Sequence, residues 1–382
     1  MKILHLSTNY VAVNNRIRHG GVERIIFDLA SWQIEKNHDV SIMGMEDTLI
    51  KGAKNISIYP SNIQSILNSD PEQYSELMDE SCKCICDFIL EHDIEVVHDH
   101  FGFFTASGYC NQIIEEMFKI RVICTIYSLP DNPYYISIYH KLKKQLKLYS
   151  PIIKCFPVSQ DHLDLISEYL PVKSFIYNGV NEKNFPYLGK KDEFYLSMAS
   201  LVSGKGHDLG IKWANENNKK LIVIGKPDPN ITNPGLIKFV KQNCYNISHL
   251  ITNDTEKTVK NIFATFKKHS VLYVESVDET LKCILLSRAK ALLMLVRWRE
   301  PFAITVLESL SCGTPVIASE IGSLKEAIVD GVNGYLVKDL KELTLATDNI
   351  SNIDSKTCRE SVVSSFSRNK MAFDYMREYK NV

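Results

Sequence analysis

Two glutamates, Glu300 and Glu308, are separated by seven residues in the stretch WREPFAITVLESLSCGTPVIA. The stretch reads as a strand end, a turn and a helix, which would place the two carboxylates about 10 Å apart at roughly 1.5 Å rise per residue. Carboxylates accept hydrogen bonds from hydroxyl groups, and the amides that open a helix attract anions. Those amides belong to Phe302, Ala303, Ile304 and Thr305. The pattern therefore predicts a ligand with both hydroxyl and anionic groups.

A lysine in a glycine-flanked loop is a second candidate for anion chemistry. Lys205 stands between Gly204 and Gly206, soon after the strand-like run FYLSMAS. Its ammonium would stabilise negative charge that grows on a phosphate as a bond breaks, and the alternative is a mobile surface lysine. Gly20 and Gly21 precede a predicted helix. They would offer backbone donors to a phosphate beside the positive helix end, or simply form a tight turn.

Two histidines, His98 and His100, follow the strand-like run IEVV. Because side chains alternate along a strand, both point to one face and Asp99 points to the other. The pair could contact a ligand or could be satisfied core histidines. A metal site with Asp99 is a third alternative, although the opposite orientation of the aspartate argues against it.

Elements of alternating type must position these residues. From KILHLS onward, short β-rich runs alternate with longer helical patterns along the whole chain. Such alternation predicts an α/β protein in which crossover helices connect parallel strands. Ligands are then expected at the carboxyl ends of the strands, where the candidate residues lie.

The chain is expected to divide where the helical pattern stops, between Val172 and Phe185. We expect a first domain over residues 1–172 and a second over 173–360. Residues 361–382 predict a terminal amphipathic helix whose apolar face must dock on another element. The apolar residues at near-helical spacing are Phe366, Met371, Tyr375, Met376 and Tyr379.

The composition is that of an ordinary globular protein. The chain has 382 residues, 45% of them hydrophobic and 23% charged, which is enough for two domains with a core each. The formal net charge of -1 gives no reason to expect nucleic acid as a partner. The N-terminus reads as a buried strand, and no apolar run has the roughly 18 residues of a membrane span. We therefore expect a cytoplasmic protein.

Ten cysteines are scattered along the chain, mostly inside apolar runs. We expect buried free thiols of a reducing compartment rather than disulfides. Cys82, Cys84 and Cys86 form a cluster, and thiols at i and i+4 share a helix face that could bind a metal. No paired Cys or His nearby completes such a site, so a helix that happens to carry thiols is the favoured interpretation.

The order of the motifs resembles the retaining family 4 glycosyltransferases. The segment from Glu300 reproduces their E-P-F, then the second glutamate at Glu308, then C-G-T-P-V at residues 312–316. The resemblance continues in HGGVERIIFDLA, VVHDHFGF, YNGVN, KGHDL and FSRNKMAFDYMREY, so it covers nearly the whole chain. It implies the GT-B fold, an α/β architecture of two Rossmann-like, doubly wound domains facing a central cleft. The terminal helix would pack back on the first domain.

The resemblance also implies an activity. The protein would be a retaining hexosyltransferase that moves a sugar from a nucleotide-diphosphate sugar, with UDP-sugar favoured over GDP-sugar, to a saccharide or lipid-linked saccharide acceptor. The expected setting is cell-surface polysaccharide biosynthesis in a bacterium. The departing phosphate would take the acceptor proton in a front-face displacement, so no dedicated general base is needed. The donor is a substrate, and the family needs no cofactor and no protein-bound metal.

Three residues match catalytic positions of the family. Glu300 and His100 would orient the sugar, and Lys205 would stabilise the diphosphate. Glu308 would accept hydrogen bonds from the paired ribose hydroxyls of the donor. The matching donor-binding positions are Gly20, Gly21, Ser200, Val277 beside the base, Phe302, Ala303, Ile304, Thr305 and Glu308.

The sequence departs from the family pattern at three of its positions. Ser200 stands where an arginine of the cationic clamp is usual, and Arg297 or Arg299 would replace that charge only if the loop turned it inward. Tyr127 stands where relatives often carry histidine, and Ala303 where they usually carry glycine. A non-catalytic nucleotide-sugar-binding subunit of a glycosyltransferase complex therefore remains an alternative. A GT-B nucleotide-sugar epimerase or a sugar phosphorylase is a further one, although the epimerases lack the E-P-F pattern and no pyridoxal lysine site is identified for a phosphorylase.

A basic segment suggests where the acceptor is met. The run YHKLKKQLKLY predicts a helix with apolar residues on one face and lysines at 141, 143, 144 and 147 elsewhere. Such a helix would rest on an anionic membrane surface, at the inner face of the membrane, as a lipid-linked acceptor would require. A solvated helix face is the more usual meaning of the pattern.

Overall fold

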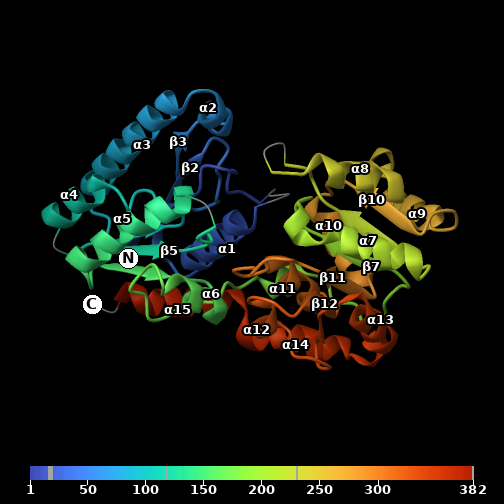
Figure 1. Cartoon of the computed structure of the whole chain (residues 1–382). Helices are drawn as coiled ribbons and strands as arrows, with labels where there is room; N and C mark the ends of the chain where they lie inside the picture. The colour runs from blue at the N-terminus through green and yellow to red at the C-terminus, as the bar shows by residue number, and fades with distance from the viewer. Residues whose placement is uncertain (16–19, 118, 132, 229–230, 381–382) are drawn as a thin grey trace. The chain divides into compact units, whose positions relative to one another are not determined.

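A computed structural model describes residues 1–15, 20–117, 119–131, 133–228 and 231–380. The chain forms two compact units, Met1–Gly179 with Arg368–Val382 and Val180–Ser367 (Figure 1). The first unit therefore extends to residue 179 rather than 172, and the chain re-enters it at 368 rather than 361. The segment before the boundary carries no regular helix or strand after Ile166, which is why the sequence pattern placed the boundary early.

The first unit contains a six-stranded parallel sheet in the order β3-β2-β1-β4-β5-β6. In chain order the strands are β1 (Lys2–Leu6), β2 (Asp39–Met45), β3 (Lys54–Tyr59), β4 (Val96–Asp99), β5 (Arg121–Thr125) and β6 (Ile153–Phe156). This is the doubly wound Rossmann order, and the direction of winding changes between β1 and β4. Ligands of such sheets bind beyond the carboxyl ends of the strands at that switch point.

The helices of the first unit are α1 (Gly21–Glu35), α2 (Ile63–Ser69), α3 (Pro71–His92), α4 (Gly108–Glu116), α5 (Pro133–Tyr149), α6 (Gln160–Ile166) and α15 (Arg368–Lys380). Helix α15, red in Figure 1, lies within this unit and packs on α1. Its buried residues are Met371, Ala372, Tyr375, Met376 and Tyr379. The Trp32 indole nitrogen donates to Asn369 Oδ1 at 2.9 Å. The terminal helix is therefore held by polar as well as apolar contacts.

Phe366 does not belong to that docked face, contrary to the expected helix over 361–382. It is the residue that follows α14 (Ser355–Ser365), and it lies in the second unit with its ring centroid 5.6 Å from that of Phe302. The two helices near the end of the chain thus pack on different units. A single helical spacing in the sequence could not reveal the break between them.

The second unit contains a seven-stranded parallel sheet in the order β13-β12-β11-β7-β8-β10-β9. In chain order the strands are β7 (Tyr195–Met198), β8 (Leu221–Ile224), β9 (Tyr245–Asn246), β10 (Val271–Val274), β11 (Ala291–Met294), β12 (Val316–Ser319) and β13 (Gly334–Val337). The winding changes direction between β7 and β11. The loops after these two strands therefore meet at the switch point of this sheet.

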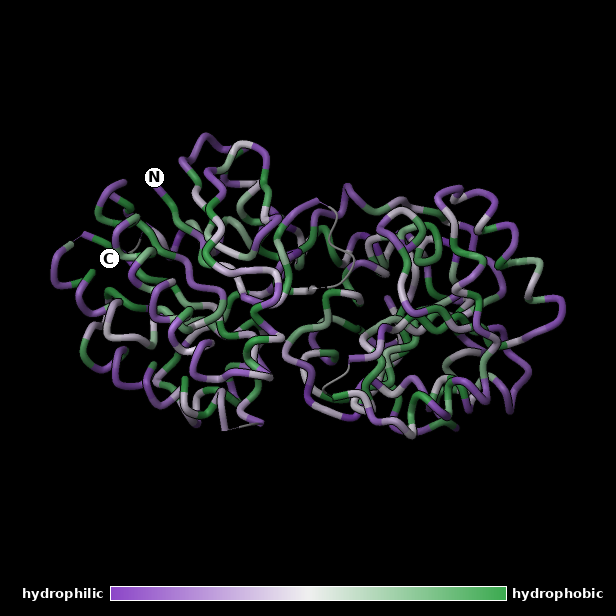
Figure 2. The backbone as a smooth tube through the Cα atoms, turned by 90° about the horizontal axis from the view of Figure 1, so that it is seen from above, coloured by the Kyte–Doolittle hydropathy of each residue, from purple (hydrophilic) through white to green (hydrophobic). Residues whose placement is uncertain are grey.

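The helices of the second unit are α7 (His207–Glu216), α8 (Pro234–Asn243), α9 (Thr255–Thr265), α10 (Glu279–Arg288), α11 (Ile304–Ser311), α12 (Leu324–Ala327), α13 (Leu340–Asn349) and α14. Aspartate side chains cap several of them, including Asp278 before α10 and Asp339 before α13. All four residues of β8, β10 and β11 are buried. Such continuous burial is expected of parallel strands covered by helices on both faces. In Figure 2 the apolar segments accordingly gather inside each unit.

Candidate active site

The two residues with the strongest sequence signal meet at the switch point of the second sheet. Lys205 lies in the loop after β7, and Glu300 lies in the loop after β11. The ammonium of Lys205 is 2.7 Å from Glu300 Oε2, and both side chains are largely buried, at 16% and 13% exposure. The structure therefore places the predicted cation and the predicted carboxylate in one ion pair.

A tryptophan completes this pair. The indole nitrogen of Trp298 donates to Glu300 Oε2 at 2.7 Å, so both donors converge on one carboxylate oxygen. The Lys205 ammonium also lies 5.1 Å from the centroid of the Trp298 ring. Glu300 Oε1 makes no hydrogen bond to any residue that the structure describes, so it can accept one from a ligand.

Glycines bring the two loops into contact. A Cβ on Gly204 would lie 2.1 Å from the Trp298 ring. Gly206 has a φ of 68°, and a Cβ there would lie 1.7 Å from the carbonyl oxygen of Leu295. Only glycine fits at these two places, since any side chain would push the Lys205 loop off the strand end.

Arg297 does not turn toward Glu300. Its guanidinium binds both carboxylate oxygens of Asp208, at 2.7 and 2.6 Å, and the carbonyl of Ser203 at 2.7 Å. Ser200, the position of the missing arginine, is exposed, as is Arg299. In this structure Arg297 therefore does not replace the family's second cation.

Helix α11 begins directly after this loop. Ala303 is its N-cap residue, and no side chain from the described part of the chain caps it. This contrasts with α10, where the carboxylate of Asp278 accepts from the amide of Leu281 at 2.8 Å. The amides of Ile304 and Thr305 thus open a helix whose positive end accepts no side-chain cap from the described residues. That is the arrangement that a phosphate group requires.

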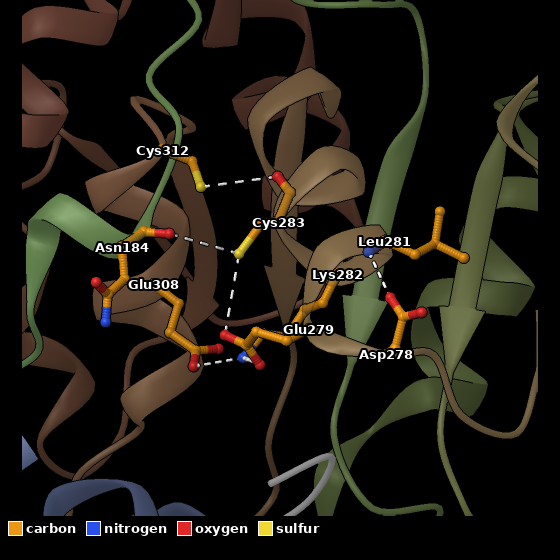
Figure 3. A network of polar contacts seen from close by, with 8 residues as sticks. All are labelled: Asn184, Asp278, Glu279, Leu281, Lys282, Cys283, Glu308 and Cys312. Carbon is orange, nitrogen blue, oxygen red and sulfur yellow. Dashed lines mark hydrogen bonds and ion pairs between the residues drawn. The ribbon is translucent and has the colours of Figure 1, made fainter. Parts of the chain in front are cut away.

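Glu308 lies on the second turn of α11 and faces α10, as Figure 3 shows. Its Oε1 is 2.7 Å from the ammonium of Lys282, which is also 2.9 Å from Glu279 Oε2. Val277 is buried just before Asp278, the N-cap residue of α10, and its place beside the base of the donor stays a prediction. Two carboxylates and one lysine therefore form a second charged cluster in the same unit.

His100 is buried at the switch point of the first sheet and takes part in a chain of hydrogen bonds. Gln33 Nε2 donates to the Tyr379 hydroxyl, so its Oε1 accepts from His5 Nε2 at 2.7 Å. His5 Nδ1 must then accept from His100 Nε2, at 2.9 Å. His100 Nδ1 is left to accept from the Tyr127 hydroxyl, at 3.3 Å. Burial, together with His5, holds the pKa of His100 well below its usual range.

His100 is thus a neutral imidazole with both nitrogens engaged, and its side chain is only 2% exposed. Its contact with a sugar stays a prediction that requires a local rearrangement. His98 is a satisfied core histidine: Nδ1 is 2.6 Å from the Tyr379 hydroxyl and Nε2 is 2.7 Å from Thr125 Oγ1. The atoms of His5, His98 and His100 lie close enough for a metal ion. However, their nitrogens already have protein partners, so the cluster fits a hydrogen-bond network better than a metal site.

Asp99 organises the loop that follows β4. Its carboxylate accepts from the amides of Phe101, Gly102 and Thr105, and from the Thr105 hydroxyl at 2.7 Å. These contacts explain why an aspartate stands between the two histidines. The same hydrogen bonds engage the carboxylate that would have been a ligand in a metal site with His98 and His100.

The glycine loop before α1 has an unexpected neighbour. Gly20 has a φ of 117° and is the N-cap residue of α1, with no side-chain cap from the described residues. The buried carboxylate of Glu23 accepts from the Thr8 hydroxyl, and its Oε2 lies 2.5 Å from where a Cβ on Gly20 would be. Burial raises the pKa of Glu23. A phosphate at Gly20 and Gly21 stays a prediction, and it would have to approach beside this carboxyl group.

The three neighbouring thiols lie on α3. Cys82 and Cys86 are buried while Cys84 is exposed. Burial raises the pKa of Cys82 to about 12, which disfavours the thiolate that a metal requires.

Sequence reasoning missed several partners of the site. Trp298 stands two residues before Glu300, but the amino-acid sequence does not show that its indole donates to the Glu300 carboxylate. Lys282, His5 and Gln33 are distant in sequence from the residues they contact, and no local pattern marks them.

Comparison with known proteins agrees with this geometry. Residues 181–356 match the family model described as "Glycosyl transferases group 1". An uncharacterised 41.2 kDa protein in the cps region of Klebsiella pneumoniae is 24% identical over 299 residues, covering 75% of this chain and 79% of that protein. An uncharacterised glycosyltransferase of Methanocaldococcus jannaschii is 28% identical over 274 residues, 67% of this chain and 66% of that protein.

Solved structures extend the likeness to both units. Sucrose-phosphate synthase from Thermosynechococcus elongatus superposes with a TM-score of 0.72 at 15% identity, over 100% of this chain and 98% of that one. HepE of Anabaena, solved in complex with UDP-glucose, gives 0.68 at 13% identity, over 99% and 98% of the two chains. The fold is GT-B. The predicted fold class is therefore confirmed, and the sequence match supports a glycosyltransferase of group 1.

Proposed function

We propose that the protein is a retaining glycosyltransferase that uses a nucleotide-diphosphate sugar, UDP-sugar in preference to GDP-sugar. The observation that carries the proposal is the meeting of Lys205, Glu300 and the uncapped start of α11 at the switch point of the second sheet. A cation and helix amides suit a diphosphate, and the neighbouring carboxylate suits sugar hydroxyls. HepE of Anabaena was solved with UDP-glucose, which supports the choice of donor.

Leaving-group stabilisation supplies most of the catalysis in this proposal. The bond from the anomeric carbon to the β-phosphate oxygen breaks, and the acceptor oxygen forms the new bond on the same face. The acceptor proton passes to the departing phosphate. Lys205 and the amides of Ile304 and Thr305 stabilise the charge that grows there, while Glu300 Oε1 orients the sugar. The chain's own donors thus offset the charge of the diphosphate, so we propose a metal-independent reaction without a cofactor.

We propose a saccharide or lipid-linked saccharide as the acceptor, bound by the first unit. Helix α5 carries exposed lysines at 141, 143, 144 and 147, which would attract an anionic membrane surface. Among the described residues, every helix is too short or too polar to cross a membrane. The proposed location is the cytoplasm, at the inner face of the membrane. The relative in the cps region of K. pneumoniae supports a role in cell-surface glycan synthesis.

Calorimetry with UDP, GDP and their sugars tests the proposal, followed by assay of donor hydrolysis without acceptor. We expect binding of a UDP-sugar and slow release of free sugar with retained anomeric configuration. Inverted product would overturn the retaining mechanism, and absence of binding to every nucleotide would overturn the function.

A non-catalytic nucleotide-sugar-binding subunit is the second candidate. It is favoured by Ser200 in place of the arginine and by the engagement of Arg297 with Asp208. The same experiment separates the two functions, because such a subunit binds the nucleotide-sugar but neither hydrolyses nor transfers it.

A further inference from the structure

The ion pair of Glu308 is built from two helices. Lys282 lies on α10, one turn after Glu279, and its ammonium is 2.9 Å from Glu279 Oε2 and 2.7 Å from Glu308 Oε1 (Figure 3). The side chains of Lys282 and Glu308 are only 12% and 7% exposed. Charges with so little water around them require partners, so Lys282 determines how the Glu308 carboxylate is held.

The pair leaves half of the carboxylate available. Lys282 binds Glu308 Oε1, whereas Oε2 makes no hydrogen bond to any residue in the described ranges. A carboxylate fixed through one oxygen presents the other in a single orientation, and two neighbouring hydroxyls can donate to it. The cluster carries two carboxylates and one ammonium, so it retains acceptor capacity after the ion pairs form.

We propose that Lys282, itself held by Glu279, is a positioning residue for Glu308 and thereby sets the preference of the site for ribose over deoxyribose. This inference rests on the proposed function, and on the family resemblance for the assignment of the donor's ribose hydroxyls to Glu308. A site built to bind a hydroxyl discriminates strongly against the analogue that lacks it, since the buried acceptor is then left unpaired. Loss of Lys282 frees the carboxylate to rotate, and that discrimination falls.

Calorimetry with UDP and 2′-deoxy-UDP, and with GDP and 2′-deoxy-GDP, tests the inference. We expect the wild type to bind the ribonucleotide at least about tenfold more tightly. Lys282→Met should weaken ribonucleotide binding about tenfold and leave the deoxynucleotide nearly unchanged, so that the ratio falls toward one. Glu308→Gln should give the same result without removing the lysine, and Lys282→Arg should restore part of the ratio.

Lys290→Met is the matched control. Lys290 forms another ion pair of this unit, with its ammonium 2.7 Å from Glu193, and this pair does not include Glu308. Thermal melting of each variant shows whether it is folded. A Lys282→Met protein that is folded and keeps the wild-type ratio would overturn the inference. A wild type that binds UDP or GDP without preferring ribose also overturns it but leaves the proposed function standing. Failure to bind any of the four nucleotides overturns both.

Discussion

The switch points of the two sheets carry opposite chemistry. In the first unit, His5 and His100 are linked to Gln33 and Tyr127 in a buried chain of neutral groups. In the second unit, Lys205 and Glu300 form an ion pair that retains some exposure. Both sheets are doubly wound and parallel, so the topology alone does not explain the difference.

The two switch points differ in the free energy that burial of their side chains costs, which is smaller for neutral groups than for charged ones. Neutral imidazoles can be buried when every nitrogen has a partner, and burial lowers the pKa of His5 to about 4. Lys205 and Glu300 are largely buried and charged, so each needs the other as a partner while no ligand is bound. The sheet edge with Lys205 and Glu300, which we call the charged edge, therefore suits a diphosphate sugar. The sheet edge with His5 and His100, which we call the neutral edge, suits a ligand without charge at the point of contact, such as the hydroxyl of an acceptor.

The largest effect is expected from breaking the charged edge. Lys205→Ala and Glu300→Gln should each lower kcat/KM for transfer by at least about 100-fold, because each removes a group that acts on the developing charge or the sugar. Steady-state assay with a UDP-sugar measures this. The melting temperature of each variant shows whether it is folded, because removing one partner of a largely buried ion pair also lowers stability.

The control uses another lysine–glutamate ion pair, more exposed at 70% and 39%, that has no part in the proposed site. Lys338 is 3.3 Å from Glu320 in the same unit, and Lys338→Ala and Glu320→Gln remove it in the same way. Both should retain turnover. Equal losses in the two pairs would mean that the charge of Lys205 and Glu300 has no special role.

The neutral edge is expected to fail in acid. Burial lowers the pKa of His5 to about 4 and those of His98 and His100 well below 6.5. These histidines take up protons near pH 6.5 in the unfolded chain but not in the folded chain. Their contribution to the free energy of unfolding is therefore highest above pH 6.5 and decreases as the pH falls toward 4. For His5 alone the loss is on the order of 3 kcal/mol at 1.36 kcal/mol per pKa unit.

Hydrogen exchange of each unit at pH 7 and pH 5 measures this difference. Among the described residues of the second unit, His207 is the comparable imidazole, and burial lowers its pKa to about 4. We therefore expect amides of β1, β4 and α15 to lose more protection than those of β7 and β8. Equal losses in both units would contradict the assignment of three neutral histidines to the first.

Much of the fold could be predicted from local pattern. Alternating runs of β-rich and helical sequence reflect burial of strands on two faces, and this gave the parallel α/β architecture of both units. The unit boundaries were less accurate, because residues 167–179 form no helix or strand to mark the end of the first unit. Phe366 was assigned to the wrong unit for a related reason. Helical spacing shows that a residue faces a core but not which core.

The candidate site was predictable where chemistry is encoded in neighbouring residues. Glu300, Glu308 and the helix amides lie in one stretch, and Lys205 lies between its two glycines. The partners that orient them come from elsewhere in the chain. Lys282 reaches Glu308 because α10 packs on α11, and His5 reaches His100 because β1 pairs with β4. Pairing of this kind depends on tertiary packing, which no spacing in a single sequence reports.

A smaller effect is expected at Trp298. Trp298→Phe removes the indole donor to Glu300 Oε2 but keeps an aromatic ring against Gly204 and Lys205. Loss of one hydrogen bond to a charged group costs about 1.5 kcal/mol, so kcat/KM should fall roughly tenfold. Trp32→Phe is the matched control, because it removes an indole hydrogen bond to Asn369 in the first unit. That variant should lower stability without lowering turnover, and a similar loss of turnover in both would contradict a special role for Trp298.

The smallest effect on kcat/KM is expected from a substitution of Arg297. This variant tests whether the charged edge has one cation, Lys205, or two. Its ion pair with Asp208 is substantially exposed, at 40% and 31%, and exposed pairs contribute about 0 to 1 kcal/mol. The backbone amide of Arg297, which donates to the Gly204 carbonyl at 2.8 Å, is kept in any variant. Arg297→Gln should therefore lower kcat/KM less than about threefold. Should the loss instead approach that of Lys205→Ala, Arg297 must leave Asp208 when the donor binds and take the place of the arginine missing at Ser200. The salt dependence of donor binding would separate the two cases, because a second cation on the diphosphate makes that dependence steeper.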